Sequence, residues 1–414
     1  MKSSRWSWEH IKPAFNFTVL VASLGYFVDM YDLVLYGIVR IPSLTSLGIT
    51  GDELVTKGMF LLNMQMIGML IGGIIWGILG DKKGRLSVLF GSIALYSIAN
   101  IANAFVTTVP AYAFARFFAG VGLAGELGAA ITLVSEIMKK ESRGYGTTIV
   151  ASVGILGSVT AGLVGDYFTW QWAYIFGGLL GLVLLVLRAK MLESGMFTSL
   201  QSNKAVKKGD FFSLFTNRKR FFKYLQCILI GLPMWFVVGI LIMLSPEFAV
   251  KLGVTGSVSA GKSIMYCYSG LVLGDLLSGF SSQFFRSRKR IVLIFLMLAS
   301  ALIIVYLNSY HLPLNLFYAL VFVMGISIGY WAVFVTIASE QFGTNLRATV
   351  TTTVPNFVRG GVVLITLSFD ALKSSFGLEG AAAIVGFITI ALALVSLFYM
   401  EETYNKELNY LEEN

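Results

Sequence analysis

Residues 77–85 read GILGDKKGR, a short charged stretch between two long apolar runs. Apolar runs of about twenty residues are long enough to cross a bilayer as helices. Asp81, Lys82, Lys83 and Arg85 would be costly inside hydrocarbon, so we expect this stretch to form a loop at the end of a span. The stretch therefore predicts two membrane-spanning helices joined by a charged turn.

The whole chain has the composition of a membrane protein. Apolar residues make up 56% of its 414 residues and charged residues 13%, and its mean hydropathy is +0.78. A soluble domain carries about 25% charged residues. The long alternating runs that a β-barrel needs are absent from the sequence. We therefore predict an all-α polytopic membrane protein with twelve transmembrane helices, at residues 14–39, 55–79, 86–106, 110–138, 144–165, 171–190, 221–244, 261–282, 291–309, 314–341, 348–371 and 380–399.

Basic residues are distributed unevenly between the two ends of these spans. An even number of spans places both termini on one side of the membrane. Five Lys or Arg residues fall on the loops of the opposite side, and they are Arg40, Lys57, Lys251, Lys262 and Lys373. Arg116 and Arg359 lie within spans, and all the others belong to the side of the termini. Because cytoplasmic loops carry the excess of positive charge, we expect a multi-pass protein of the inner (plasma) membrane with both termini cytoplasmic.

Two sequence patterns occur twice. S-E-x6-R is found at 135–143 and again at 339–347, with an offset of 204 residues. The stretch 77–85 has a weaker counterpart at an offset of 202, where Gln283 replaces Asp81. Repeats of this kind are typical of transporters built from two parallel halves. We predict six-helix bundles at 1–190 and 221–400, a cytoplasmic linker at 191–220, and a cytoplasmic tail at 401–414 that is a short helix or a disordered end.

The loop motif G-x-x-x-D-[KR]-x-G-R and the E-x6-R that follows span four resemble the major facilitator superfamily, and the resemblance covers the whole chain. R-FFAGVGLAGE in span four and D-x-Y-D-x-x-x-Y-G in span one resemble its metabolite:proton symporter group. Span one also resembles phosphate:proton symporters, and the E-S-G at 193–195 resembles sugar:proton symporters. The resemblance implies two pseudo-symmetric six-helix bundles (the major facilitator fold) that rock around a central cavity, in rocker-switch alternating access.

Two aspartates lie inside the first span, in GYFVDMYDLVLYG at 25–37. Asp29, Asp32 and Tyr36 follow Gly25 at spacings that place all four on one helix face. A charge at the bilayer centre costs about 2.5 kcal/mol or more, so this face should point to protein or water. With a rise of 1.5 Å per residue, Asp32 lies about 8 Å and Arg116 of span four about 12 Å outside the midplane. We therefore expect these two residues to pair.

The same pairing has a counterpart in the resemblance. Sugar:proton symporters place an Asp in span one and an Arg in span four at matching positions. The resemblance implies that Asp32 takes the proton and that Arg116 adjusts the proton affinity of Asp32. We expect Asp29, Asp32, Arg116 and Glu126 to take part in proton coupling. Two alternatives remain open: Asp32 and Arg116 form a structural ion pair, or Asp29 and Glu126 are protonated carboxyls hydrogen-bonded inside the bundle.

A polar stripe in span eleven suggests the substrate site. Asn356 and Arg359 lie on one helix face, and arginine suits the bidentate binding of planar anions. The alternative is a structural pair between Arg359 and Asp275 of span eight, and packing alone would explain each aromatic residue nearby. We expect the substrate to contact Arg359, Asn356, Tyr330, Trp331, Trp235, Tyr36 and Tyr268.

Charged residues recur at the cytoplasmic ends of the spans. In the superfamily such groups form ion pairs that hold the cytoplasmic side shut, which implies a gate with two alternative arrangements. The alternative is that these charges only fix the orientation, as we expect for Lys82 and Lys83. The residues that we assign to the cytoplasmic gate are Gly77, Asp81, Gly84, Arg85, Glu136, Arg143, Glu340 and Arg347.

The sequence lacks the motifs of several other functions. It has two histidines and no GxxxxGK[ST], so we predict neither an enzyme nor direct use of ATP. Cys227 and Cys267 lie in apolar runs, so we predict no metal site. We expect a functional monomer with no cofactor and no nucleic-acid partner. It would take up a small organic anion or zwitterion, such as a carboxylate metabolite or amino acid, by symport with protons. A proton-driven exporter and an uncoupled facilitator or transceptor are the alternatives.

Overall fold

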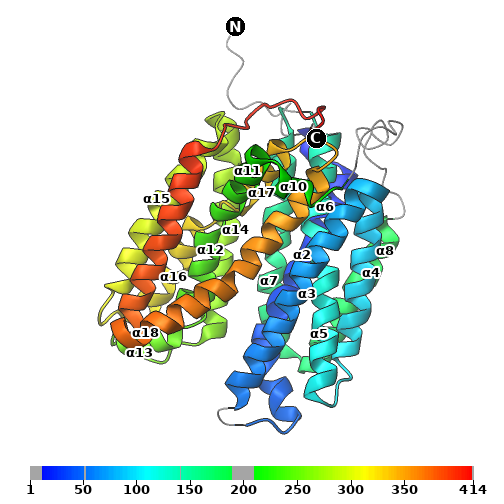
Figure 1. Cartoon of the computed structure of the whole chain (residues 1–414). Helices are drawn as coiled ribbons and strands as arrows, with labels where there is room; N and C mark the ends of the chain where they lie inside the picture. The colour runs from blue at the N-terminus through cyan, green and yellow to red at the C-terminus, as the bar shows by residue number, and fades with distance from the viewer. Residues whose placement is uncertain (1–11, 51–52, 140, 189–208, 413–414) are drawn as a thin grey trace.

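The computed structural model describes residues 12–50, 53–139, 141–188 and 209–412. Long helices packed side by side make up almost all of it (Figure 1). Within these residues, eleven helical stretches are long and apolar enough to cross a membrane. The predicted span at 261–282 coincides with a helix of similar length, α14 (Ala260–Phe284), in which Lys262, Asp275 and several serines reduce the hydropathy. Helices satisfy their own backbone hydrogen bonds, as crossing a membrane requires.

The first half of the chain forms one bundle, drawn in blue to green on the right of Figure 1. Side-chain caps start two of its helices: Asn16 accepts from the Val19 N–H, and Thr108 from the Ala111 N–H. One predicted span, 110–138, is divided into two helices. The elements are η1 (Lys12–Ala14), α2 (Phe17–Ser46), α3 (Glu53–Lys83), α4 (Arg85–Asn103), α5 (Val109–Leu123), α6 (Glu126–Ile137), α7 (Arg143–Tyr167) and α8 (Trp170–Arg188).

The second half forms the other bundle, in green to red on the left of Figure 1. Pro233, which lacks an N–H, lies at the start of α12, where the predicted span 221–244 is interrupted. The last two spans turn at Gly377, whose φ of 69° favours glycine. The elements are α10 (Ser213–Thr216), α11 (Arg218–Leu229), α12 (Leu232–Phe236), the π-turn η2 (Val237–Ile242), α13 (Ser245–Lys251), α14, α15 (Arg288–Leu307), α16 (Leu314–Ser327), α17 (Trp331–Gln341) and α18 (Arg347–Tyr399).

The structure describes part of the predicted linker and most of the predicted tail. Within the predicted linker, 191–208 lie outside the described residues, whereas 209–220 contain α10 and the first turn of α11. The tail at 401–412 is neither a helix nor a disordered end. It runs across one end of both bundles, at the top of Figure 1. We call this end, where Asp81, Glu136, Glu340 and Arg347 lie, the charged end.

The two halves meet along two pairs of helices, α3 with α18 and α7 with α14. Gly77 of α3 approaches α18 so closely that an added Cβ would lie 2.9 Å from the Thr349 Cα. Gly279 of α14, the counterpart of Gly77 in the repeat, lies against the side chain of Thr148 in α7, whose Cβ would be 2.6 Å from an added Cβ. Glycine is needed at both positions because a side chain would push the halves apart. The sequence repeat therefore corresponds to a repeated contact between the halves.

Candidate functional site

Spans four and ten are each broken near their middle. α5 gives way to α6 at Ala124–Gly125, and α16 gives way to α17 at 328–330. The offset between the two breaks equals the 204 residues of the S-E-x6-R repeat. Half-helices that begin inside a membrane protein place N-terminal backbone N–H groups near the centre of the bundle. Glu126 begins α6 and Trp331 begins α17, so each break delivers one of the predicted site residues to the interior.

Asp32 and Arg116 lie together, as predicted from their depths. The Arg116 Nη1 is 3.6 Å from the Asp32 Oδ1, and both side chains are fully buried. Arg116 also donates to the Gln65 Oε1. Its guanidinium lies between the rings of Tyr36 and Tyr174, 5.2 and 5.7 Å from their centroids. The cation therefore has partners other than Asp32, and these remain when Asp32 is neutral.

Asp29 is the second buried carboxyl of α2. Its side chain is fully buried, and neither oxygen has a hydrogen-bond partner within the described residues. The charges that act on it come from Arg359 of the opposite half, Glu126 and Asp32. A buried carboxyl without a partner is uncommon and marks a candidate functional group. Asp29 thus lies between the predicted proton site and the predicted anion site.

Glu126 has a partner that was not predicted from sequence. Arg188, the last residue of α8, donates to both Glu126 oxygens, with 2.9 Å from Nη1 to Oε2. The same Nη1 donates to the Leu89 carbonyl at 2.5 Å, and both charged side chains are fully buried. A bidentate pair of this kind satisfies the whole carboxylate. The sequence gives no sign of this pairing, because Arg188 ends its span and basic residues at span ends are usually orientation signals.

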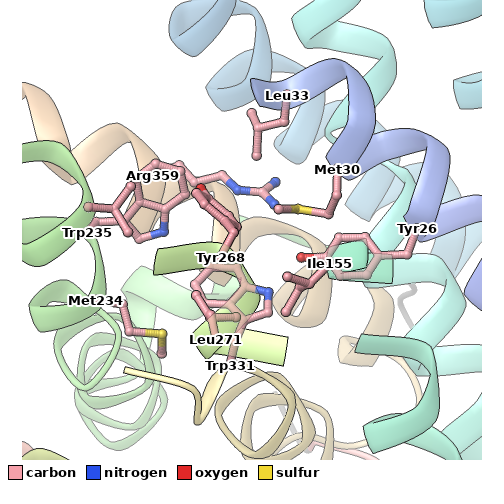
Figure 2. Close-up of a pocket in the computed structure, with 11 residues that line it drawn as sticks. Tyr26, Met30, Leu33, Ile155, Met234, Trp235, Tyr268, Leu271, Trp331 and Arg359 are labelled. Atoms are coloured by element: carbon pink, nitrogen blue, oxygen red, sulfur yellow. The ribbon is translucent and has the colours of Figure 1, made fainter. Parts of the chain in front are cut away.

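A cavity lies between the two halves and is lined by residues of both (Figure 2). Its volume is about 30 Å³, so the lining side chains nearly close the cavity in this structure. Four of the residues predicted to contact substrate line it: Trp235, Tyr268, Trp331 and Arg359. The remaining lining residues are Tyr26, Met30, Leu33, Ile155, Met234, Val238 and Leu271. The wall is therefore aromatic and aliphatic, with one guanidinium, as is common in small-molecule sites.

Arg359 of α18 is the cation of this cavity. Its Nη1 donates to the Asn356 Oδ1 at 3.3 Å, and its guanidinium carbon lies 5.6 Å from the centroid of the Trp331 ring. Its Nε has no hydrogen-bond partner within the described residues. Asn356 is itself held by the Ala124 carbonyl, at the break in span four. Arg359 is thus fixed in place while part of its donor edge remains available.

Three predicted residues lie elsewhere. Asp275 forms no ion pair with Arg359 among the described residues; its Oδ1 accepts from the Ala332 N–H at 3.0 Å. Tyr36 donates to the Gly58 carbonyl, and Tyr330 donates to the Ile230 carbonyl. Both tyrosines are buried and neither lines the cavity in this structure. The helix rotations that decide this were not available from spacing alone.

The charged end holds a symmetric pair of cross-connections. Glu136 pairs with Arg85 of its own half at 2.8 Å and with Arg347 of the other half at 2.9 Å. Glu340 pairs with Arg288 of its own half at 3.3 Å and with Arg143 of the other half at 3.7 Å. The four ion pairs are buried, and two of them join the halves. The ion pairs of Glu340 are longer than those of Glu136. Glu340 belongs to the second copy of the repeat, in which the loop motif is also incomplete.

Asp81 adds a further connection between the halves. Its oxygens accept from the N–H groups of Ala348 and Thr349 in the first turn of α18, at 3.1 and 2.8 Å. Carboxylates at a helix N-terminus are favoured by the exposed N–H groups there. Gln283, its counterpart, accepts from the Gly144 N–H in the first turn of α7 at 3.0 Å once its amide oxygen faces that helix. In the second copy of the repeat, Gln283 therefore keeps the helix cap that Asp81 makes in the first copy, but without the negative charge.

Gly84 belongs to the same region, directly before α4. Its φ is 102°, in the range that side chains rarely adopt. The turn that it allows places Arg85 in the first turn of α4, with its Nη1 3.4 Å from Asp81. All eight predicted gate residues therefore lie at the charged end, and most of them contact the opposite half or a residue that does.

The tail covers these ion pairs. The Lys406 and Leu408 carbonyls accept from Arg143 and Arg347, at 3.1 and 2.5 Å. Glu402 accepts from the Ser287 hydroxyl and the Arg288 N–H at the start of α15. Partial burial opposes ionisation of Glu402, but these hydrogen bonds hold its pKa below the usual value. The tail is thus anchored to the second half and reaches an arginine of the first.

Comparison with known proteins gives one family. The model described as Major Facilitator Superfamily matches residues 22–366. A Bacillus subtilis protein named for niacin and nicotinamide transport is 27% identical over 94% of this chain and 96% of its own length. A gentisate transporter of Corynebacterium glutamicum is 23% identical over 94% of this chain and 88% of its own. A benzoate transport protein of Acinetobacter baylyi is 30% identical over 42% of this chain and 39% of its own length.

Solved structures agree on the fold. A proton:xylose symporter bound to a bromo-deoxyglucose superposes with a TM-score of 0.75 at 16% identity, covering 95% of this chain and 97% of that one. Identity at this level supports a shared architecture and carries no information about the substrate.

Proposed function

Because the chain belongs to the major facilitator superfamily, we propose that it takes up a small aromatic monocarboxylate together with protons. The chain is a multi-pass membrane transporter of small molecules and not an enzyme.

The arrangement of Arg359 in the cavity carries the proposal about the substrate. A guanidinium beside the Trp331 ring, with Trp235 and Tyr268 on the same wall, suits a flat ring that bears a carboxylate. The carboxylate would pair with the guanidinium, and the ring would stack on the aromatic side chains. Niacin, benzoate and gentisate, for which relatives are named, are all aromatic rings with a carboxyl group.

Proton coupling is assigned to Asp32, with Asp29 as the second candidate. Protonation of Asp32 removes its ion pair with Arg116, while Gln65 and two tyrosine rings continue to hold the guanidinium. The site can therefore exist in two protonation states without leaving Arg116 isolated in the interior. We assign Glu126 to its ion pair with Arg188 rather than to proton transfer, because that pair already satisfies both carboxylate oxygens.

The charged end supports alternating access. We propose that it faces the cytoplasm, as the excess of Lys and Arg there favours. Its ion pairs between halves would hold the cytoplasmic side closed and would break when the two bundles rock. We expect a plasma-membrane protein that functions as a monomer, with the two bundles at 1–190 and 221–400 as the moving parts.

Reconstitution into liposomes tests the proposal directly. Radiolabelled nicotinate should accumulate when an acidic exterior is imposed, and a protonophore should abolish the accumulation. Benzoate and gentisate should compete with it, whereas a neutral sugar should not. Extrusion driven by the same gradient would instead identify an exporter, and uptake that only equilibrates would identify an uncoupled facilitator.

A further inference from the structure

Asp275 lies at the break in span ten. It does not pair with Arg359, the cation that was predicted to lie at a similar depth. The backbone of α14, which carries Asp275, approaches this break closely at two glycines. An added Cβ on Gly329 would lie 2.5 Å from the Gly274 Cα, and one on Gly274 would lie 2.3 Å from the Ile326 carbonyl oxygen. Only glycines allow such an approach, and the result is that Asp275 reaches the first turn of α17.

The contact that Asp275 makes there is a helix cap supplied by another helix. Its Oδ1 accepts from the N–H of Ala332, the second residue of α17, at 3.0 Å. The first N–H groups of a helix have no partner within the helix, and a carboxylate from outside satisfies them. No side chain of its own segment caps α17, because Tyr330 occupies the capping position. Asp275 therefore caps the start of α17 from the neighbouring helix α14.

The start of α17 is also the wall of the cavity. Trp331, the first residue of the helix, lines the cavity and stacks on the Arg359 guanidinium at 5.6 Å. Its Nε1 and the Arg359 Nε both lack a hydrogen-bond partner within the described residues. Figure 2 shows both side chains on the same cavity. A shift of the first turn of α17 would move the ring away from the cation.

We propose that Asp275 is a positioning residue for substrate specificity: by capping α17 it holds Trp331 against Arg359. The inference rests on the proposed function, since Trp331 and Arg359 are taken as the substrate contacts. It differs from an ion pair with Arg359 and from a proton carrier, because it needs the acceptor oxygen of Asp275 and not its charge.

The test compares Asp275→Asn with Asp275→Ala. Asparagine keeps an acceptor oxygen, so the KM for nicotinate should stay within about twofold of wild type, whereas alanine should raise it about fivefold, the effect of losing a cap. The maximal rate should change little in either variant. Ser263→Ala, a buried polar residue of the same helix outside the cavity wall, is the control. Equal loss in the Asn and Ala variants, or a normal KM in the Ala variant, would overturn the inference.

Two further measurements separate this inference from the proposed function. Hydrogen exchange at the Ala332 amide should be several-fold faster in Asp275→Ala and unchanged in Asp275→Asn, whether or not nicotinate is the substrate. An unchanged exchange rate at the Ala332 amide in Asp275→Ala would show that Asp275 does not cap α17. In a double-mutant cycle, Asp275→Ala should add nothing to Trp331→Ala, because the first acts through the second. Wild-type protein that binds no nicotinate, benzoate or gentisate would refute the proposed function alone.

Discussion

Arg347 of the second half donates to Glu136 of the first half at 2.9 Å, at the charged end. The same Glu136 also accepts from Arg85 of its own half, so one carboxylate holds two buried arginines together. Removing one member of such a group costs about 3–5 kcal/mol, because a buried charge is left without a partner. The contact between halves should therefore depend strongly on Glu136.

Glu136→Gln should open the charged end. Spin labels at Lys83 and Arg286, which are exposed at this end of the two halves, report the separation directly. The distance distribution should gain a longer component in the variant, and transport should slow. Glu141→Gln, an exposed change in the neighbouring loop, should leave both unchanged. An unaltered distribution in Glu136→Gln would show that the ion pair does not hold the halves together.

The tail should be released when Glu402 loses its charge. Its hydrogen bonds with Ser287 and with N–H groups at the start of α15 hold its pKa below the usual value. The folded pKa is the lower one, so the stabilisation is complete above the unfolded value and is lost as the pH falls through the folded one. Protection against hydrogen exchange in 403–412, measured relative to the intrinsic rate at each pH, should therefore fall under acidic conditions, and Glu402→Gln should show the same loss of protection at neutral pH. Protection that is independent of both changes would contradict this anchor.

Arg359→Gln should weaken substrate binding more than it slows the transport cycle. Loss of a charge-assisted hydrogen bond to a carboxylate costs about 1.5–3 kcal/mol, which is a rise in KM of about 10- to 150-fold. The KM of Arg359→Lys should lie between those of wild type and Arg359→Gln, because an ammonium keeps the charge but lacks the planar pair of donors. Nicotinate uptake at varied concentration measures both. Lys373→Gln, an exposed change outside the cavity, is the control, and a wild-type KM in Arg359→Gln would refute the anion site.

Glu126 and Arg188 should behave as a structural pair. Arg188→Met alone leaves a buried carboxylate, so the thermal midpoint of unfolding should fall substantially, consistent with a cost of about 3–5 kcal/mol. The double variant Arg188→Met with Glu126→Gln should recover much of that loss and should still couple uptake to protons. A stable double variant with no coupling would return Glu126 to the proton pathway.

Several features were predictable from sequence because they depend on the depth of a residue in its span or on a repeated motif. Asp32 and Arg116 were paired from their depths, and the repeated S-E-x6-R motif located Glu136 and Glu340, whose role in ion pairs was implied by the superfamily resemblance. These inferences need only the rise per residue and the number of spans. They do not need the rotation of one helix relative to another.

The remaining features depend on contacts between helices. Tyr36 and Tyr330 share faces with site residues, yet both donate to backbone carbonyls away from the cavity. Arg188 ends a span, where its pairing with Glu126 could not be distinguished from an orientation signal. Asp275 was matched to Arg359 by depth, whereas the break in span ten offered it backbone N–H groups instead. Single-sequence periodicity does not predict such breaks, because apolar residues continue through both.

The coupling role of Asp32 is the central claim, and one measurement tests it most directly. Asp32→Asn is reconstituted into liposomes, and labelled nicotinate uptake is followed with and without an acidic exterior, beside protein-free liposomes. We predict that the variant exchanges nicotinate across the membrane at equal pH but no longer accumulates it when the gradient is imposed. Accumulation equal to that of wild type, driven by the same gradient, would contradict the account.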